Sequence, residues 1–322
     1  MSKRLKVNFI CAPGDIVACT AALRDYALAF PDTRIVYCGA HKELLANNPH
    51  VEIGSGACEV TLCYAEGQRR VADGRWNQHF ISWFYEDIYR KTGRQFRMTR
   101  PTPALYLPLE RRVSRPVEGR YWLMMAGGKT DMPVKHWEFD RYKELATRLR
   151  ELGIATVQSG AAHDIHPDAN CDLNLVGWGG LSELMWQVYH ADGIICPITC
   201  AMHMAAAFNK PCVVLAGGRE DPCWEAYNNE YNQFEPGLTV TTPHRYLNRV
   251  GSLECCKTHG CWVRKLSGKE EPSCRDVVRG KQPLPRCMAD ITVEHVVAAV
   301  QSYYHDRTIP APVYAGLSFC GR

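Results

Sequence analysis

Asp15 is the first residue of the chain whose type and position could do chemistry. With Gly14 it forms the turn between a short apolar strand, residues 6–10, and a helix over residues 16–30. Ligands of open α/β sheets bind at the carboxyl ends of the strands. A carboxylate in that place can take a proton from a substrate hydroxyl as a general base. Asp is also favoured at helix N-caps, so the position alone leaves both roles open.

A glycine-rich loop with two lysines follows the first strand of the second half of the chain. It contains Gly128, Lys129 and Thr130, and Lys135 follows shortly afterwards. Glycines let backbone N–H groups approach an anion, and lysines add positive charge. The loop lacks the Gly-x4-Gly-Lys-[Ser/Thr] pattern of a P-loop, and no Gly-x-Gly-x-x-Gly follows either opening strand. The spacing leaves two interpretations, a phosphate site of another kind or an ordinary polar loop.

Two further loops at predicted strand ends carry candidate ligand residues. Asp164 follows a strand that ends at Gly160, and an acid in this place can bind a ribose hydroxyl. The alternative is a solvated loop carboxylate. Thr199 and Cys200 begin a helix directly after a strand, with His203 one turn later. Free N–H groups at a helix N-terminus suit a phosphate, whereas a lone His on an apolar helix is also typical of a core residue.

Cysteine is unusually frequent: the chain has 16, and five of them fall within residues 255–287. The surrounding segment is rich in Gly, Pro and charge, so these five are poor core residues. Four thiolates can bind zinc or iron tetrahedrally. We therefore predict a structural Zn or Fe on Cys256, Cys261, Cys274 and Cys287, with Cys255 as the alternative to Cys256. Free or redox-active thiols are the competing interpretation.

Two runs of alternating strands and helices position these loops, and they predict an α/β protein with two parallel sheets. Between the runs, residues 90–120 hold nine Lys or Arg against two acids, together with several prolines. We predict an N-terminal domain at residues 1–118 and a C-terminal domain at 119–300, which includes the cysteine-rich segment 253–288. Residues 301–322 form a C-terminal tail. Ligands are then expected in the cleft between the two domains.

The bulk composition excludes several classes of protein. The 322 residues are 46% hydrophobic and 22% charged, which excludes a disordered or fibrous chain. No apolar run reaches the roughly 18 residues of a membrane span, and the N-terminus lacks the apolar core of a signal peptide. The formal charge of +4 does not indicate a wholesale nucleic-acid binder and leaves a local basic patch open. We therefore expect a cytoplasmic protein, in which disulfides are rare.

Several segments together resemble the ADP-heptose:lipopolysaccharide heptosyltransferases, glycosyltransferase family 9. They cover most of residues 5–225 and are Gly14-Asp15-Ile16-Val17, Asn48-Pro49-His50-Val51, Lys135-His136-Trp137, Gly160 with Asp164, Asn174-Leu175-Val176-Gly177, Leu181-Ser182-Glu183-Leu184 and Met202-His203-Met204-Ala205-Ala206-Ala207. The resemblance implies a GT-B fold, with two Rossmann-like domains facing a central cleft and a C-terminal tail that packs back on the first domain. It also implies inverting transfer of a heptose or hexose from an ADP-linked sugar to an acceptor hydroxyl, without a catalytic divalent metal.

The resemblance also implies roles for individual residues. Asp15 matches the catalytic base, Lys135 the lysine that contacts the donor phosphate, and Asp164 the acid that holds the nucleotide ribose. The implied donor-binding residues are Gly14, Gly128, Lys129, Thr130, Lys135, Asp164, Thr199, Cys200 and His203. The sequence departs from the family at one motif, where Ile198 and Cys200 replace an Asp and a Gly. In the family that Asp contacts the sugar, so an inactive nucleotide-sugar-binding scaffold is an alternative function. A GT-B epimerase, which would use a nucleotide sugar without an acceptor, is a separate alternative.

The predicted partners are a nucleotide-diphosphate sugar and an acceptor on the N-terminal side. The basic residues 90–120 indicate an anionic acceptor, such as a phosphorylated lipopolysaccharide core or DNA with hydroxylated bases. A protein acceptor is a third alternative, and a solvated basic linker needs no acceptor at all. Family members that modify autotransporter proteins carry a cysteine-bound iron, which is similar in kind to the cluster at residues 256–287. Oligomerisation is left open.

Overall fold

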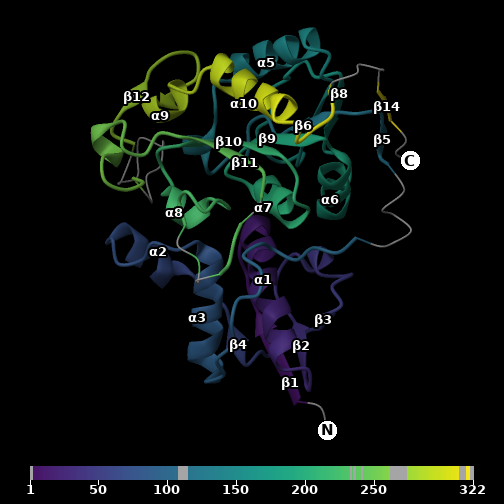
Figure 1. Cartoon of the computed structure of the whole chain (residues 1–322), viewed down its shortest axis with the longest axis vertical. Helices are drawn as coiled ribbons and strands as arrows, with labels where there is room; N and C mark the ends of the chain where they lie inside the picture. Colours follow the sequence, from purple (N-terminus) through teal and green to yellow (C-terminus); the bar gives the residue numbers. More distant parts are fainter. Residues whose placement is uncertain are drawn as a thin grey trace.

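The computed structural model describes residues 3–107, 115–232, 234, 237–240, 242–261, 274–311 and 317–319. Two parallel sheets form its frame, one in the lower and one in the upper half of Figure 1. The carboxyl end of the first strand and the start of the first helix lie at the junction of the two halves. The alternation of strands and helices and the parallel sheets predicted from the sequence are confirmed.

The N-terminal half contains a four-stranded parallel sheet with the order β3-β2-β1-β4. Its strands are β1 (Lys3–Asn8), β2 (Thr33–Tyr37), β3 (Val51–Ile53) and β4 (Val60–Thr61). The helices of this half are α1 (Pro13–Ala29), α2 (Ala65–Ala72) and α3 (Phe80–Thr92), together with the short 3-10 helix η1 (Lys42–Leu44).

The C-terminal half contains a six-stranded parallel sheet with the order β11-β10-β9-β6-β7-β8. Its strands are β6 (Trp122–Met124), β7 (Thr156–Gly160), β8 (Leu173–Val176), β9 (Gly193–Pro197), β10 (Cys212–Gly217) and β11 (His244–Asn248). Its helical elements are η2 (Pro133–Lys135), α5 (Phe139–Glu151), α6 (Leu181–His190), α7 (Cys200–Ala207), α8 (Pro222–Glu225), η3 (Glu254–Cys256), α9 (Arg286–Ala289) and α10 (Val293–His305). Two small antiparallel pairs join β12 (Val277–Val278) to β13 (Leu284–Pro285) and β5 (Val117–Glu118) to β14 (Ser318–Phe319).

Burial follows from the position of each element in these layers. Every residue of β9 and β10 is buried, as expected for central parallel strands covered on both faces. Helix α1 is buried without interruption from Ile16 to Tyr26, which a helix achieves only when it is covered all round. It lies against the first sheet and packs against α7 of the other half. The α1–α7 contact therefore joins the two halves.

The C-terminal helix α10 packs on the second sheet. Its Tyr303 hydroxyl donates to the carbonyl oxygens of Cys212 (3.2 Å) and Pro243 (2.7 Å).

Residues 312–316 and 320–322 lie outside the described residues, so packing of the tail on the first domain stays a prediction, as do the domain limits at 118 and 300. Among the described residues, no helix combines the length and apolarity needed to cross a membrane.

Many basic residues between positions 90 and 120 have partners within the protein. Arg94 donates to the hydroxyls of Tyr26 and Thr33, Lys91 pairs with Asp87, and further pairs join Arg90 to Glu66 and Glu86 and Arg120 to Asp192. These contacts anchor the chain as it passes from the first sheet to the second. Arg90, Lys91 and Arg120 are thus paired with carboxylates inside the fold.

A buried ion pair fixes this passing segment to α1. Asp25 is 1% exposed and pairs with Arg24 at 2.8 Å. It also accepts hydrogen bonds from the hydroxyl of Tyr85 (2.6 Å) and the backbone N–H of Thr99 (2.7 Å). Arg24 in turn donates to the carbonyl oxygen of Thr102 (3.1 Å). Burial acts to raise the pKa of Asp25, but its bonds with Arg24 and Thr99 lower it overall.

Replacing Asp25→Ala is expected to lower the free energy of unfolding by about 3–5 kcal/mol, because it leaves the Arg24 guanidinium buried without its counter-ion. Urea denaturation measures the loss. The matched control is Glu52→Ala, which breaks the exposed pair between Arg34 and Glu52 and should cost less than about 1 kcal/mol. Equal effects of the two substitutions would contradict the role assigned to Asp25.

Candidate functional site

A cleft of about 430 Å³ lies where the two halves meet, and it collects most of the predicted site residues. Those that line it are Gly14, Asp15, Gly128, Lys129, Lys135, Asp164, Thr199, Cys200 and His203. Thr130 is exposed and does not line the cleft. The residues converge because the carboxyl ends of β1, β6, β7 and β9 all open toward the same place.

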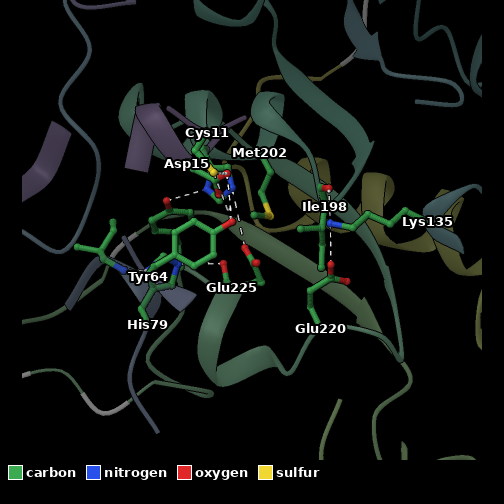
Figure 2. A network of polar contacts seen from close by, with 12 residues as sticks. Cys11, Asp15, Tyr64, His79, Lys135, Ile198, Met202, Glu220 and Glu225 are labelled. Carbon is green, nitrogen blue, oxygen red and sulfur yellow. Dashed lines mark hydrogen bonds and ion pairs between the residues drawn. The ribbon is translucent and has the colours of Figure 1, made fainter. Parts of the chain in front are cut away.

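Asp15 lies in the first turn of α1 and faces the cleft. Its Oδ2 atom accepts hydrogen bonds from the thiol of Cys11 (2.7 Å) and the hydroxyl of Tyr64 (3.3 Å). Figure 2 shows these three side chains together on one side of the polar network. Burial raises the pKa of Asp15, and Cys11, Lys135 and Tyr64 only partly oppose it. A hydrogen bond with the backbone of Ala12, the N-cap residue of α1, also acts to lower this pKa without cancelling the effect of burial. A basic carboxylate is thus presented to the cleft.

Gly14 allows the N-terminus of α1 to approach α7 closely. A Cβ atom on Gly14 would lie 2.9 Å from Cδ2 of His203 and 3.4 Å from the Cα of Cys200. The first of these distances is shorter than real carbon contacts allow. The glycine therefore sets the spacing between Asp15 on one half and the N-terminus of α7 on the other.

The N-terminus of α7 has the features of an anion site. Thr199 occupies the N-cap position without capping the helix through its side chain. Its hydroxyl is buried and has no hydrogen-bond partner among the described residues. Uncapped N–H groups at a helix N-terminus carry partial positive charge. Thr199, Cys200 and the following Ala201 all line the cleft, so a bound anion could satisfy these donors.

Lys135 has a counter-ion in the cleft that sequence reasoning missed. Its Nζ atom pairs with Oε1 of Glu220 at 2.6 Å, and Arg219 pairs with the same carboxylate. Burial acts to raise the pKa of Glu220, but these two cations lower it overall. One carboxylate thus compensates two cations, and one positive charge remains. The only signal in the sequence was the position of residues 217–221 after a strand.

Glu225, at the end of α8, is a second missed carboxyl. Burial raises its pKa to about 8, with Glu220 and Asp15 adding to the shift and Lys135 opposing it. Its Oε2 atom lies 3.9 Å from Nε2 of His203. At neutral pH this carboxyl is therefore mostly protonated. No motif in the sequence distinguishes Glu225 from an ordinary helical glutamate.

His203 belongs to a buried group of aromatic and imidazole rings beneath the cleft. Its Nδ1 atom forms a hydrogen bond with the hydroxyl of Tyr227 (2.9 Å), whose ring packs against those of His79 and His244. His79 comes from α3's N-cap in the N-terminal half, and its Nε2 donates to the backbone oxygen of Glu225 (3.0 Å). His203 is therefore a buried core residue that also lines the cleft.

The loop around Asp164 closes the other end of the cleft. Gly128 pairs with Ile165 through two backbone hydrogen bonds, which brings the β6 and β7 loops together. A Cβ on Gly127, whose φ is +89°, would lie 2.0 Å from the Ile165 carbonyl oxygen, so only glycine fits there. Asp164 and Lys129 line the cleft at this end, while His166 Nδ1 bonds to the Ala126 carbonyl oxygen (2.7 Å).

The five clustered cysteines converge outside this cleft, at the carboxyl end of β10. Cys255, Cys261 and Cys287 have pKa values raised first by burial and then by one another, by Cys256 and by Cys274. A Cβ on Gly218 would lie 2.9 Å from Cys256 Sγ and 3.3 Å from Cys287 Cβ. Within the described part of the chain, however, no three His, Cys, Asp or Glu side chains are arranged to hold a metal. The metal site that the cysteine spacing predicts therefore stays a prediction.

Comparisons with known proteins agree with this architecture. The family model of glycosyltransferase family 9 (heptosyltransferase) matches residues 88–247. A family 9 glycosyl transferase from Veillonella parvula DSM 2008 is 15% identical, with a TM-score of 0.63 over 94% of this chain and 98% of the other. The ADP-heptose lipopolysaccharide heptosyltransferase II of E. coli is 16% identical, with a TM-score of 0.55 over 95% and 100%.

A third similar structure is the iron-containing dodecameric glycosyltransferase TibC from enterotoxigenic E. coli H10407. It is 13% identical, with a TM-score of 0.58 over 95% of this chain and 78% of TibC. At these identities the structures show a shared fold. A search of curated protein sequences finds no match.

Two parallel sheets that open on one cleft, together with the family match, define this protein as a glycosyltransferase. The chain is a divergent member of glycosyltransferase family 9, the family of the heptosyltransferases. The resemblance noted in the sequence is thereby confirmed.

The histidines beneath the cleft predict a loss of stability in acid. Burial lowers the pKa of His79 to about 3, and burial together with His79 lowers that of His244 to about 3. An unfolded histidine titrates near 6.5, so between pH 6.5 and 3 the unfolded chain binds protons that the native chain does not. The free energy of unfolding should therefore fall as the pH falls through this window.

Urea denaturation between pH 7 and 4 measures this slope. His244→Gln should make the pH dependence shallower, because it removes one of the buried histidines whose pKa is lowered. His163→Gln is the control, since that side chain is 84% exposed and should leave the slope unchanged. An unchanged slope in His244→Gln would show that His244 is not a source of the acid sensitivity.

Proposed function

We propose that this protein is an inverting glycosyltransferase that moves a sugar from an ADP-linked donor to an acceptor hydroxyl, with Asp15 as the general base. The observation that carries the proposal is the arrangement across the cleft. A basic carboxylate on α1 faces the uncapped N-terminus of α7, and the packing of Gly14 against His203 fixes their spacing.

The C-terminal half supplies groups suited to a nucleoside diphosphate. The α7 N–H groups and the unpartnered Thr199 hydroxyl would bind phosphate oxygens. Lys135 and Arg219 share one carboxylate, so they add one net positive charge. Lys129 is exposed at the rim and can contribute another. Asp164 would accept hydrogen bonds from the ribose hydroxyls.

The transfer step follows from these positions. The acceptor hydroxyl gives its proton to the Asp15 carboxylate, and its oxygen attacks the anomeric carbon from the side opposite the diphosphate. The bond from that carbon to the diphosphate oxygen breaks, and its electron pair leaves with the diphosphate. Attack opposite the leaving group inverts the anomeric centre. The α7 dipole and the cations stabilise the leaving charge, a task for which no catalytic divalent metal is then needed.

The acceptor would approach from the N-terminal half, residues 1–118, with the donor in residues 119–300. Arg90, Lys91 and Arg120 are paired with carboxylates within the fold, so these three side chains offer less positive charge to an anionic acceptor than the sequence indicates. A phosphorylated lipopolysaccharide core, DNA with hydroxylated bases and a protein are the acceptor classes to compare. A cytoplasmic location is part of the same proposal.

Asp15→Asn should lower the rate of transfer by about 10²–10⁴-fold, the usual contribution of a general base, while nucleotide binding stays within about twofold. The first measurement is a thermal shift with ADP, GDP, UDP and dTDP. The nucleotide that gives the largest thermal shift identifies the donor. Transfer is then measured as the release of that nucleotide diphosphate from its sugars in the presence of each acceptor class. Tyr64→Phe is the matched control: it removes one hydrogen bond to Asp15 and should slow transfer far less.

Equal loss of transfer and of nucleotide binding in Asp15→Asn would contradict the base assignment. No shift with any nucleotide would favour the alternative suggested by Ile198 and Cys200, an inactive scaffold.

We also propose that the cysteine cluster holds a structural Zn or Fe through Cys256, Cys261, Cys274 and Cys287, with Cys255 as the alternative to Cys256. The convergence of these thiols beside Gly218 supports it. Thiolate ligands suit both metals. Such a metal would tie the β10 end to the segment around Cys261, whose backbone N–H already donates to the Gly218 oxygen (3.1 Å).

Elemental analysis of the purified chain should find one Zn or Fe per chain, and Cys256→Ser with Cys287→Ser should remove it and lower the melting temperature. Absorption in the visible range separates thiolate-bound iron from colourless zinc. Cys63→Ser is the control, because that exposed cysteine lies in the other half. A metal-free chain, or metal retained in the double variant, would refute the site.

A further inference from the structure

Glu225 is a buried carboxyl that the transfer step above does not use. Its side chain is 13% exposed and lines the cleft. The backbone oxygen of the same residue accepts hydrogen bonds from His79 Nε2 (3.0 Å) and from the Tyr246 hydroxyl (3.3 Å). The backbone is therefore held from two directions, yet Oε2 of the side chain has no hydrogen-bond partner among the described residues. Buried polar atoms rarely lack a hydrogen-bond partner, so Oε2 of Glu225 is a candidate to bind a polar group of a ligand.

His203 provides the facing atom. Its Nδ1 is occupied by the Tyr227 hydroxyl at 2.9 Å, which leaves Nε2 directed at Glu225. The separation of 3.9 Å between Nε2 and Oε2 is too long for a hydrogen bond. A single oxygen atom can nevertheless lie about 2.8 Å from both atoms, the ordinary hydrogen-bond distance. Figure 2 shows Glu225 on the same side of the network as Asp15 and Tyr64, away from the Lys135–Glu220 pair.

We propose that Glu225 and His203 form a subsite that binds one hydroxyl of the donor sugar and so selects the sugar. This inference rests on the proposed function. Both residues belong to the half that carries the α7 N-terminus, which places the hydroxyl on the donor and not on the acceptor. Through this contact the sugar ring is oriented while its anomeric carbon faces Asp15.

The chemistry of the pair fits a neutral, bifunctional partner. Burial keeps the pKa of Glu225 near 8 and holds that of His203 well below its usual value, so both groups are uncharged at neutral pH. A protonated carboxyl can donate, an imidazole nitrogen can accept or donate, and a hydroxyl does both. Uncharged partners also avoid the repulsion that a second carboxylate would exert on the donor diphosphate.

The experiment compares nucleotides with their sugars by isothermal titration calorimetry: ADP with ADP-glucose, UDP with UDP-glucose, and GDP with GDP-mannose. In each pair, the Kd of the nucleotide divided by the Kd of its nucleotide sugar measures how much the sugar contributes to binding. Glu225→Met fills a similar volume without a polar end and should lower this ratio about tenfold for the preferred pair. Glu225→Gln keeps both a donor and an acceptor and should retain the ratio within about threefold.

The control is Glu144→Ala, which removes an exposed glutamate on α5 and should change nothing. A purely structural role of Glu225 would weaken nucleotide and nucleotide sugar alike and leave their ratio intact, which would overturn the proposal. A wild-type ratio near one for every pair would overturn it too. If no nucleotide binds at all, the donor site itself fails and the subsite falls with it, a result distinct from the other two.

Discussion

The contact between α1 and α7 is the interaction on which the rest of the structure depends. These two helices come from different sheets, and their N-termini meet where Gly14 lies against His203 and Cys200. Because a side chain at position 14 would collide with the imidazole, the approach is possible only with glycine. The contact brings a carboxylate of one half within reach of the helix N-terminus of the other. The cleft can act as a functional site only if the distance between Asp15 and the N-terminus of α7 is kept constant.

Burial around that contact changes the charges that the cleft presents. Lys135 and Arg219 are both paired with Glu220, so Lys135, which the sequence assigns to a phosphate, does not act as a free charge. Glu225 and His203 lie close by and are held uncharged by burial. The cleft therefore separates into a cationic side and a side of neutral hydrogen-bonding groups and Asp15. This division is consistent with the nucleotide-sugar donor that we propose.

The rings beneath the cleft connect the site to the stability of both halves. His79 comes from the N-terminal half and Tyr227 and His244 from the C-terminal half, and their side chains are packed together. The hydrogen bond from His79 to the Glu225 backbone oxygen spans the junction of the two halves. A change in the relative position of the sheets must therefore disturb the site.

The sequence by itself determined the alternation of strands and helices, the two parallel sheets and the loops that meet at their carboxyl ends. It did so because apolar runs and Gly or Pro punctuation are local signals, and because parallel strands all present their ends on one side. Asp15, Asp164 and the α7 N-terminus were located by that rule alone. The tertiary structure decided the rest. Glu220, Glu225, Cys11 and Tyr64 carry no local signature, since pairing, protonation and hydrogen bonding depend on distances between residues far apart in the chain. Whether Lys135 is a free cation is settled by a residue 85 positions later, and only folding brings the two together.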